Sequence, residues 1–353
     1  MEQPNNNMIM NKGNYSLDTD ERELRFNQIR GAGWEEEYAA YRNNWAALPQ
    51  NAIVSEYPLL VDIELSTVCN LKCPMCYTIT EEFKSRVGCN FMDWSLFTRI
   101  IDEIAGHVPA IRLSLRGEPT LHPDFIKCVE YAKKKGIREI SFLTNGSNLS
   151  EKSFQEIMLA GADWIIISID GLYDTYESIR KPMTFENIFE TVAMIKRIKQ
   201  AHYSEKPVIK IQSIWPAIRG NPGEFYDKFL AYADLIAFNP IIDFSGSHKG
   251  AKIIYEENFS CPQLYQRIII TSDGSYLMCS NDENQTEIIG NAYNETVYSA
   301  WHGENLTRIR NLHKEKDGFK NIQACRECYI PRKTVENETA VVHGRVITIK
   351  NYI

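Results

Sequence analysis

Residues 111–143, IRLSLRGEPTLHPDFIKCVEYAKKKGIREISFL, contain one complete unit of the fold. Two short β-branched runs, at 111–115 and 139–143, have the length and composition of strands. Between them, apolar residues recur at helical spacing over 125–132, and Gly136 is suited to end that helix. A strand, a helix and a second strand in this order predict two parallel strands joined by a right-handed crossover.

The same alternation continues from about residue 60 to residue 245. Ser150 is suited to begin one of the intervening helices and Gly161 to end it. Six strands followed by helices predict an α/β fold with parallel strands, either an open sheet or a barrel, in which ligands bind where the strands end. The strand-like runs lie at 61–66, 111–115, 139–143, 164–169, 208–214 and 235–241.

The loops that follow these strands hold the most unusual residues of the chain. They are a three-cysteine loop at 68–77, RGEPTL at 116–121, TNG at 144–146, DG at 170–171 and WP at 215–216. Because all of them follow strands, we expect them on one face of the fold. That face is the predicted site of chemistry.

Composition restricts the class of protein. With 353 residues and 44% apolar content, the chain can form one large globular domain or a large and a small one. The net charge of -7 argues against nucleic acid as a partner. No signal peptide or membrane-length apolar span is visible, which predicts a cytoplasmic protein without a membrane partner. In the reducing cytoplasm, closely spaced cysteines more often hold metal than form disulfides.

The loop VCNLKCPMCY at 68–77 carries Cys69, Cys73 and Cys76. A structural zinc site takes four protein ligands, and no further cysteine or histidine follows until Cys89. A 4Fe–4S cube held by three thiolates leaves one iron open to bind another molecule. The loop therefore favours a cluster with a free coordination position over a zinc site or a disulfide.

CNLKCPMCY resembles the CxxxCxxC signature of the radical S-adenosylmethionine (SAM) superfamily, including the aromatic Tyr77 after the third cysteine. The resemblance implies a partial (β/α)6 TIM barrel, a 4Fe–4S cluster on Cys69, Cys73 and Cys76, and SAM on the open iron. In that family an electron from the cluster cleaves SAM to a 5′-deoxyadenosyl radical, which abstracts a hydrogen atom from the substrate. The resemblance also implies an electron donor such as flavodoxin or ferredoxin.

Three further motifs are similar to motifs of this family. RGEP at 116–119 resembles its GGE motif, in which Glu118 would accept a hydrogen bond from the SAM amino group, although Arg116 replaces the first glycine. TNG resembles the end of strand three, and ISIDG with the later IRK resembles the SxDG…R pattern, so that Ser168 and Arg180 would contact the ribose or carboxylate of SAM. The resemblance thus implies SAM contacts from Tyr77, Gly117, Glu118, Asn145, Ser168 and Arg180.

A second group of cysteines lies in the C-terminal region. The dipeptide at 273–274, Asp-Gly, predicts a two-residue hairpin that brings Cys261 near Cys279, and CREC at 325–328 completes a set of four. Four thiolates suit either a structural zinc ion or a fully ligated iron–sulfur cluster. The region resembles the SPASM or twitch extension of radical SAM enzymes, which implies an auxiliary 4Fe–4S cluster on Cys261, Cys279, Cys325 and Cys328.

These regions predict three parts of the chain. Residues 1–58 form an N-terminal tail and helical extension, residues 59–255 the radical SAM barrel, and residues 256–353 the auxiliary cluster domain. The helices expected within 18–48 could cover an end of the barrel. Cys128 lies on the apolar stripe of its helix and is predicted to belong to the core.

The substrate is less clearly indicated. Residues 1–58 show no winged-helix pattern of a peptide-recognition domain, which favours a small molecule, and family analogy favours a carbohydrate-like one. A fully ligated auxiliary cluster that accepts an electron indicates net oxidation (dehydrogenation). The alternatives are epimerisation or deamination of a sugar, peptide maturation and, in another class, a zinc-binding structural or interaction module.

Side chains that could act on the substrate lie near the ends of the last two predicted strands. Gln212, Arg219, Asn239 and Asp243 are polar residues in this region. Asp243 is the candidate base that removes a hydroxyl proton. Cys89 is a candidate hydrogen-atom donor, as cysteines are in some epimerases of the superfamily.

Overall fold

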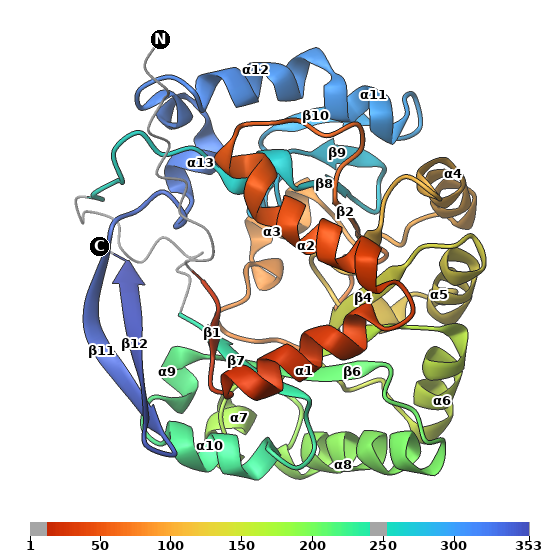
Figure 1. Ribbon diagram of the computed structural model, residues 1–353, viewed down its shortest axis with the longest axis vertical. Coiled ribbons are helices and arrows are strands. Elements are labelled where there is room, and N and C mark those ends of the chain that lie inside the picture. Colours follow the sequence, from red (N-terminus) through yellow and green to blue (C-terminus); the bar gives the residue numbers. More distant parts are fainter. Residues whose placement is uncertain (1–12, 241–252, 353) are drawn as a thin grey trace.

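The computed structural model describes residues 13–240 and 253–352. A mixed sheet of ten strands, in the order β1-β7-β6-β5-β4-β3-β2-β8-β9-β10, runs through the described part of the chain. From β2 to β7 the strands are parallel and neighbours in chain order, and helices cover their outer face (Figure 1). The predicted α/β fold with a partial (β/α)6 barrel is therefore confirmed.

The observed elements follow the predicted alternation, with some strands shorter than expected. The parallel strands are β2 (Leu60–Ile63), β3 (Ala110–Arg112), β4 (Glu139–Thr144), β5 (Trp164–Ser168), β6 (Val208–Ile214) and β7 (Leu235–Asn239). The helices around them are α4 (Trp94–Ile104), α5 (Phe125–Lys134), α6 (Glu151–Ala160), α7 (Tyr173–Ile179), α8 (Phe185–Ala201), α9 (Trp215–Ile218) and α10 (Pro222–Phe229). Ser150 caps α6 with a capping box, and Gly161 ends it in the left-handed conformation, as predicted.

Side chains of the parallel strands alternate between two faces. Isoleucine, valine and phenylalanine residues such as Ile111 and Phe142 belong to the core under the helices. The opposite face lines the barrel interior and is rich in polar side chains: Asp62, Glu64, Arg112, Ser141, Ser168, Lys210 and Gln212. Leu143, on the inner face of the central strand β4, is 37% exposed, so the interior is open at its level.

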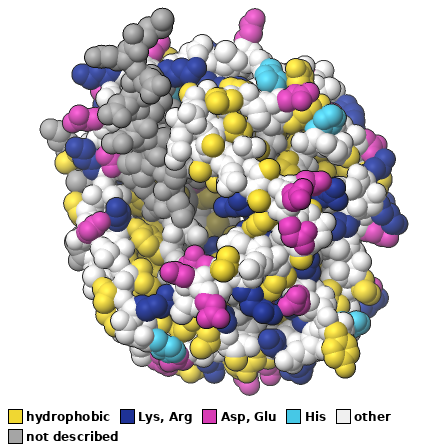
Figure 2. All heavy atoms as spheres, viewed as in Figure 1, with side chains coloured by type: hydrophobic (Ala, Val, Ile, Leu, Met, Phe, Trp, Pro, Cys, Tyr) yellow, Lys and Arg dark blue, Asp and Glu magenta, His cyan; other side chains and the backbone are white. Residues whose placement is uncertain are grey.

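Two N-terminal helices cover the end of the barrel where the strands begin (Figure 1). Phe26 of α1 (Asp20–Gly31) packs with Val208 and Leu235 at the starts of their strands, and α2 (Glu35–Gln50) packs near the starts of β2 and β3. In Figure 2, acidic and basic side chains are interspersed across this face. Ligands therefore have their site at the other end, where the strands stop.

The C-terminal region extends the barrel sheet. Strand β8 (Arg267–Ile270) pairs in parallel with β2, and β9 (Ser275–Leu277) and β10 (Ile288–Asn291) follow antiparallel. The hairpin between β8 and β9 is present, but residues 271–274 form its connection, because Asp273 caps a wider turn by accepting hydrogen bonds from Thr271 and Ser275. The predicted two-residue turn is therefore wrong.

The other elements are shorter or peripheral. They are β1 (Tyr15–Ser16), α3 (Glu81–Arg86), α11 (Val297–His302), α12 (Glu304–Leu312), α13 (Gln323–Glu327) and the two-stranded sheet of β11 (Thr334–Val342) and β12 (Arg345–Tyr352). Four short 3₁₀ helices lie at Tyr77–Ile79, Pro119–Leu121, Pro262–Tyr265 and Gly318–Asn321. No helix among the described residues combines the length and the apolar character that a membrane crossing requires.

Candidate active site

The three-cysteine loop follows β2 at the end of the barrel where the strands stop. Cys73 is buried, and Cys69 and Cys76 are half-buried. The backbone N–H of Leu71 donates to Cys69 Sγ (3.5 Å), and Thr78 Oγ1 lies 2.9 Å from Cys76 Sγ. Burial raises the pKa of Cys69 and raises that of Cys73 to about 11. Iron binding must therefore displace protons from these thiols at neutral pH.

Gly117 allows the loop after β3 to lie against the backbone that leads into Cys69. Its φ is +60°, and a Cβ at this position would come within 2.6 Å of Ser66 O and 2.8 Å of Val68 O. The N–H of Glu118 donates to Val68 O at 2.8 Å. A glycine is required here by contact with the three-cysteine loop.

Glu118 is 1% exposed and is already held by the protein. Its Oε1 accepts hydrogen bonds from Thr120 N, Thr120 Oγ1 and Thr144 Oγ1, at 3.2, 2.7 and 2.7 Å, and its Oε2 accepts one from Asn145 N at 2.7 Å. Burial raises the pKa of Glu118, and these hydrogen bonds oppose the shift. Glu118 thus ties β3 to β4, and Oε2 retains one acceptor position for a donor such as an amino group.

Asn145 joins the loop after β4 to the three-cysteine loop. Its Nδ2 donates to Asn70 Oδ1 (3.0 Å) and lies 3.9 Å from Cys69 Sγ. Asn70 Nδ2 in turn donates to Ser147 Oγ at 2.8 Å. The predicted SAM-binding residues Glu118 and Asn145 therefore lie together beside Cys69.

Arg180 lies on the other side of the loop, beside Cys73. Its guanidinium pairs with Asp170, with Nε and Nη2 each 2.6 Å from Oδ2, and its Nη1 lies 3.9 Å from Cys73 Sγ. Despite burial, the charges of Asp170 and Cys73 raise the pKa of Arg180. Ser168, 6% exposed, is at the end of the neighbouring β5. Their predicted contacts with SAM stay predictions.

Arg116, which replaces the expected first glycine, forms a buried ion pair. Its Nε and Nη2 donate to the two carboxylate oxygens of Glu64 on β2, at 2.5 and 2.6 Å. Its Nη1 donates to the carbonyl oxygen of Glu283 (3.1 Å), and its guanidinium lies over the ring of Phe83. The side chain therefore connects the barrel to the C-terminal region.

The four C-terminal cysteines come together from separate segments. Cys261 precedes a 3₁₀ helix, Cys279 follows β9, and Cys325 and Cys328 lie on and just after α13. Burial raises the pKa of all four, that of Cys261 to about 12, and the charges of other cysteines of the group add to the shift at Cys261, Cys279 and Cys325. One side chain, His313, contacts both the backbone nitrogen of Cys261 (3.3 Å) and Cys325 Sγ (3.4 Å), so these two segments lie side by side.

Both groups fit iron–sulfur clusters. Among residues 13–240 and 253–352, no three His, Cys, Asp or Glu side chains converge closely enough to bind a single metal ion. In a 4Fe–4S cube each cysteine binds a different iron, so the sulfurs can lie farther apart than around a single metal ion. N–H groups also point at the sulfurs: Asn281 Nδ2 and Ile330 N each lie 3.4 Å from Cys328 Sγ.

Glu283 is a residue that the sequence reasoning missed. It is half-buried in the loop after Cys279, and its carbonyl oxygen accepts a hydrogen bond from Arg116 Nη1 at 3.1 Å, next to the glycine that contacts the three-cysteine loop. Its own pKa is raised to about 8 by burial and by Asp282, while Arg116 opposes the shift. Two adjacent carboxylates after a predicted ligand were the available signal in the sequence.

Of the two predicted catalytic residues, Asp243 and Cys89, the structure describes Cys89. Asp243 lies outside the described residues. Cys89 is exposed on the loop after α3. Gln212 and Asn239 are in contact at 3.1 Å at the ends of β6 and β7, whereas the 62% exposed side chain of Arg219 faces Glu338 of β11. That Arg219 could face the substrate stays a prediction.

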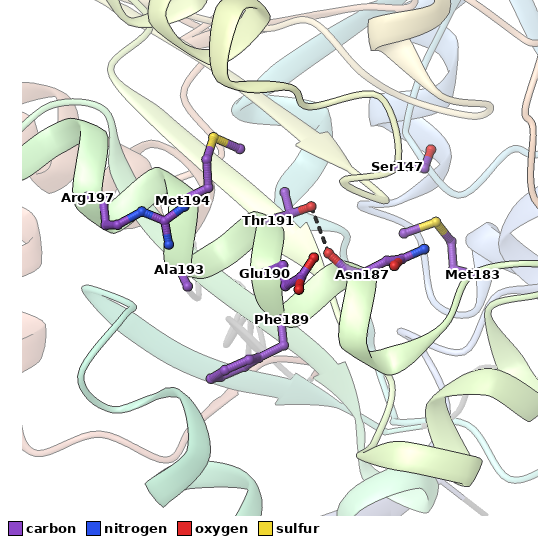
Figure 3. Close-up of a pocket in the computed structure, with 9 residues that line it drawn as sticks. All are labelled: Ser147, Met183, Asn187, Phe189, Glu190, Thr191, Ala193, Met194 and Arg197. Carbon is purple, nitrogen blue, oxygen red and sulfur yellow. Dashed lines mark hydrogen bonds between the residues drawn. The ribbon is translucent and has the colours of Figure 1, made fainter.

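A groove of 660 Å³ runs along α8 (Figure 3). Ser147, at one end, accepts the hydrogen bond from Asn70, so this end lies beside the three-cysteine loop. Its other lining residues come from α8 or the segment before it, outside the barrel, and the groove is distinct from the polar interior. The residues drawn are Ser147, Met183, Asn187, Phe189, Glu190, Thr191, Ala193, Met194 and Arg197.

Comparison with protein families gives two matches. The model of the radical SAM superfamily matches residues 63–211, and the SPASM model, an iron–sulfur cluster-binding domain, matches residues 261–329. The first range contains the three-cysteine loop and the residues around it. The second contains all four C-terminal cysteines.

Curated relatives match over part of their length. A tungsten-containing aldehyde ferredoxin oxidoreductase cofactor-modifying protein from Pyrococcus furiosus is 29% identical over 160 residues, 43% of this chain and 42% of the relative. An AdoMet-dependent heme synthase from Methanosarcina barkeri is 29% identical over 148 residues, 41% and 40% of the two chains. The chain thus spans less than half the length of these relatives.

Solved structures share the fold. SuiB from Streptococcus suis bound to S-adenosylmethionine has a TM-score of 0.56 at 14% identity, over 88% of this chain and 84% of that chain. BtrN in complex with AdoMet and 2-DOIA has a TM-score of 0.52 at 16% identity, over 82% and 98%. At these low identities, the TM-scores show a shared fold alone.

Proposed function

Because the chain belongs to the radical SAM superfamily and carries a SPASM iron–sulfur cluster-binding domain, we propose that it oxidises a CH–OH group of a small polar, carbohydrate-like metabolite to a carbonyl. We assign the SAM-binding 4Fe–4S cluster to Cys69, Cys73 and Cys76. When bound, SAM and this cluster supply the radical that takes a hydrogen atom, and the auxiliary cluster supplies an acceptor for one electron. The auxiliary cluster is assigned to Cys261, Cys279, Cys325 and Cys328.

This oxidation also releases a proton, for which the chain must provide an acceptor. Conversion of CH–OH to C=O removes a hydrogen atom, a proton and an electron. The observation that carries the proposal is the position of Glu283, which follows Cys279 by four residues and whose backbone carbonyl accepts a hydrogen bond from Arg116 (3.1 Å), next to the glycine that contacts the three-cysteine loop. We propose that Glu283 takes the hydroxyl proton as general base.

The polar barrel interior supports a hydroxyl-rich substrate. TIM-barrel interiors are usually filled by Val, Ile and Leu, whereas here charged and amide side chains alternate with them. Lys210 is 7% exposed, hydrogen bonds to Asn14 (3.1 Å) and forms no ion pair within 4 Å among the described residues. Burial, together with Arg30, lowers the pKa of Lys210 to about 7. Gln212, half-buried at the end of β6, carries an amide that can both donate to and accept from a substrate hydroxyl.

The fold by itself is compatible with other substrates. One neighbour was solved with 2-DOIA, and SuiB was also solved with its precursor peptide SuiA. The test therefore compares carbinol-deuterated sugars and aminocyclitols with deuterated peptides, using anaerobic protein reduced chemically or by a flavodoxin or ferredoxin. Deuterium in 5′-deoxyadenosine together with a new carbonyl in a sugar supports the proposal.

Controls separate the chemistry from background cleavage of SAM. A Cys73→Ala variant should release no 5′-deoxyadenosine. Glu283→Gln should transfer deuterium but form at least tenfold less carbonyl, whereas Glu287→Gln, in the same loop and facing Arg308 at 3.7 Å, should retain activity. Solvent hydrogen incorporated at the same carbon would indicate epimerisation, and deuterium transfer only from peptides would indicate maturation; either result would overturn the oxidation.

A further inference from the structure

A buried histidine links two cysteines of the C-terminal group. His313 follows the last residue of α12, is 2% exposed and is flanked by the rings of Phe259 and Phe319. Its Nδ1 lies 3.3 Å from the backbone nitrogen of Cys261, and its Nε2 lies 3.4 Å from Cys325 Sγ. The imidazole therefore bridges two predicted ligands that are far apart in the sequence.

The first of these contacts fixes the tautomer. A backbone N–H can only donate, so Nδ1 must accept through its lone pair and cannot carry a proton. The imidazole proton is then on Nε2, which faces Cys325 Sγ.

We infer that His313 donates its Nε2–H to the Cys325 thiolate and thereby raises the reduction potential of the auxiliary cluster. A hydrogen bond to a ligand sulfur withdraws electron density from the iron and stabilises the more negative, reduced state. His313 is thus a positioning and tuning residue that acts through Cys325. The inference rests on the auxiliary cluster and is independent of the proposed substrate oxidation.

Among the described residues, His313 and Asn281 are the side chains whose nitrogens reach a sulfur of this group. The remaining donors are backbone N–H groups, such as that of Ile330 to Cys328 at 3.4 Å, which mutation does not remove. Changing His313 therefore removes one donor and leaves the other donors in place. The flanking phenylalanine rings make Phe a suitable replacement in size and polarity.

The experiment uses the full chain with Cys69, Cys73 and Cys76 replaced by Ala, so that a single cluster gives the signal. Anaerobic redox titration followed by EPR of the reduced cluster measures its potential. His313→Phe should lower the equilibrium constant for reduction at least tenfold, which is about 59 mV for one electron. His313→Gln, whose amide can still donate, should shift it by less than half as much. His302→Phe, at an exposed histidine on α11, should not shift it.

A second measurement does not depend on a variant at position 313. In protein labelled with ¹⁵N-histidine, pulsed EPR of the reduced cluster should detect a weak nitrogen coupling of the size expected across a hydrogen bond. Absence of this coupling, or an unchanged potential in His313→Phe with full iron content, would refute the inference. A strong coupling typical of a direct ligand, with loss of the cluster in His313→Phe, would overturn it in favour of histidine ligation.

Discussion

Replacement of Arg116 by methionine should destabilise the protein by about 3–5 kcal/mol, because it leaves a buried carboxylate without its cation. The side chains of Arg116 and Glu64 are 1% and 0% exposed, and their bidentate contact has distances of 2.5 and 2.6 Å. After the change, Glu64 would keep only backbone donors, from residue 116 and from Ser272. Those two hydrogen bonds do not compensate for an isolated charge at this depth.

Thermal unfolding of the anaerobic protein measures this effect. The usual unfolding entropy per residue gives about 0.7 kcal/mol per degree for a 353-residue chain, so Tm should fall by about 4–7 °C. Lys84→Met removes a cation from the exposed pair with Glu81, whose side chains are 50% and 90% exposed, and should leave Tm unchanged. Glu64→Leu combined with Arg116→Met removes both charges and should recover most of the loss.

Two results would refute this reasoning. Equal Tm values for Arg116→Met and Lys84→Met would mean that Arg116 is not needed to compensate a buried charge. A double variant no more stable than Arg116→Met would mean that lost packing, including the contact of Arg116 with the Phe83 ring, causes the effect.

Three further predictions address the site. Gly117→Ala should remove the SAM-binding cluster, about four irons, and leave the auxiliary cluster, because the added methyl would lie 2.6 Å from Ser66 O. Unchanged iron and sulfide content would show that the three-cysteine loop can move to make room. Cys328→Ala should likewise remove about four irons, whereas Cys128→Ala, at a core position, should remove no iron. Zinc in place of iron would contradict the cluster assignment. Carbonyl formation should rise as pH increases through about 8, since Glu283 accepts a proton only when ionised; the same rise in Glu283→Gln would exclude it as the base.

Patterns that act over a few residues could be read from the sequence. The cap at Ser150 and the stop at Gly161 depend on backbone geometry within one turn, and the structure has both. Cys69, Cys73 and Cys76 lie within eight residues, so they share one short loop in any fold that the chain could adopt. The order of strands and helices required parallel strands, because each crossover spans a complete helix.

Partners that are distant in the sequence could not be read in this way. The guanidinium of Arg116 donates hydrogen bonds to Glu64, 52 residues away in the sequence, and to the carbonyl of Glu283, 167 residues away. Likewise, the carboxylate of Glu118, predicted to bind SAM, is largely occupied by Thr120, Thr144 and Asn145. Each of these contacts depends on how neighbouring strand ends are packed, which local patterns do not encode.

Periodicity and spacing in the sequence were enough to predict the β/α order, the two cysteine groups and the end of the barrel where the chemistry is expected. The folded chain was needed to show that Glu283 meets Arg116, that His313 bridges Cys261 and Cys325, and that Arg219 lies opposite Glu338 of β11. The physical reason is that hydrogen bonds and ion pairs are short-ranged, so their partners are set by the packing of segments that meet only in the folded chain.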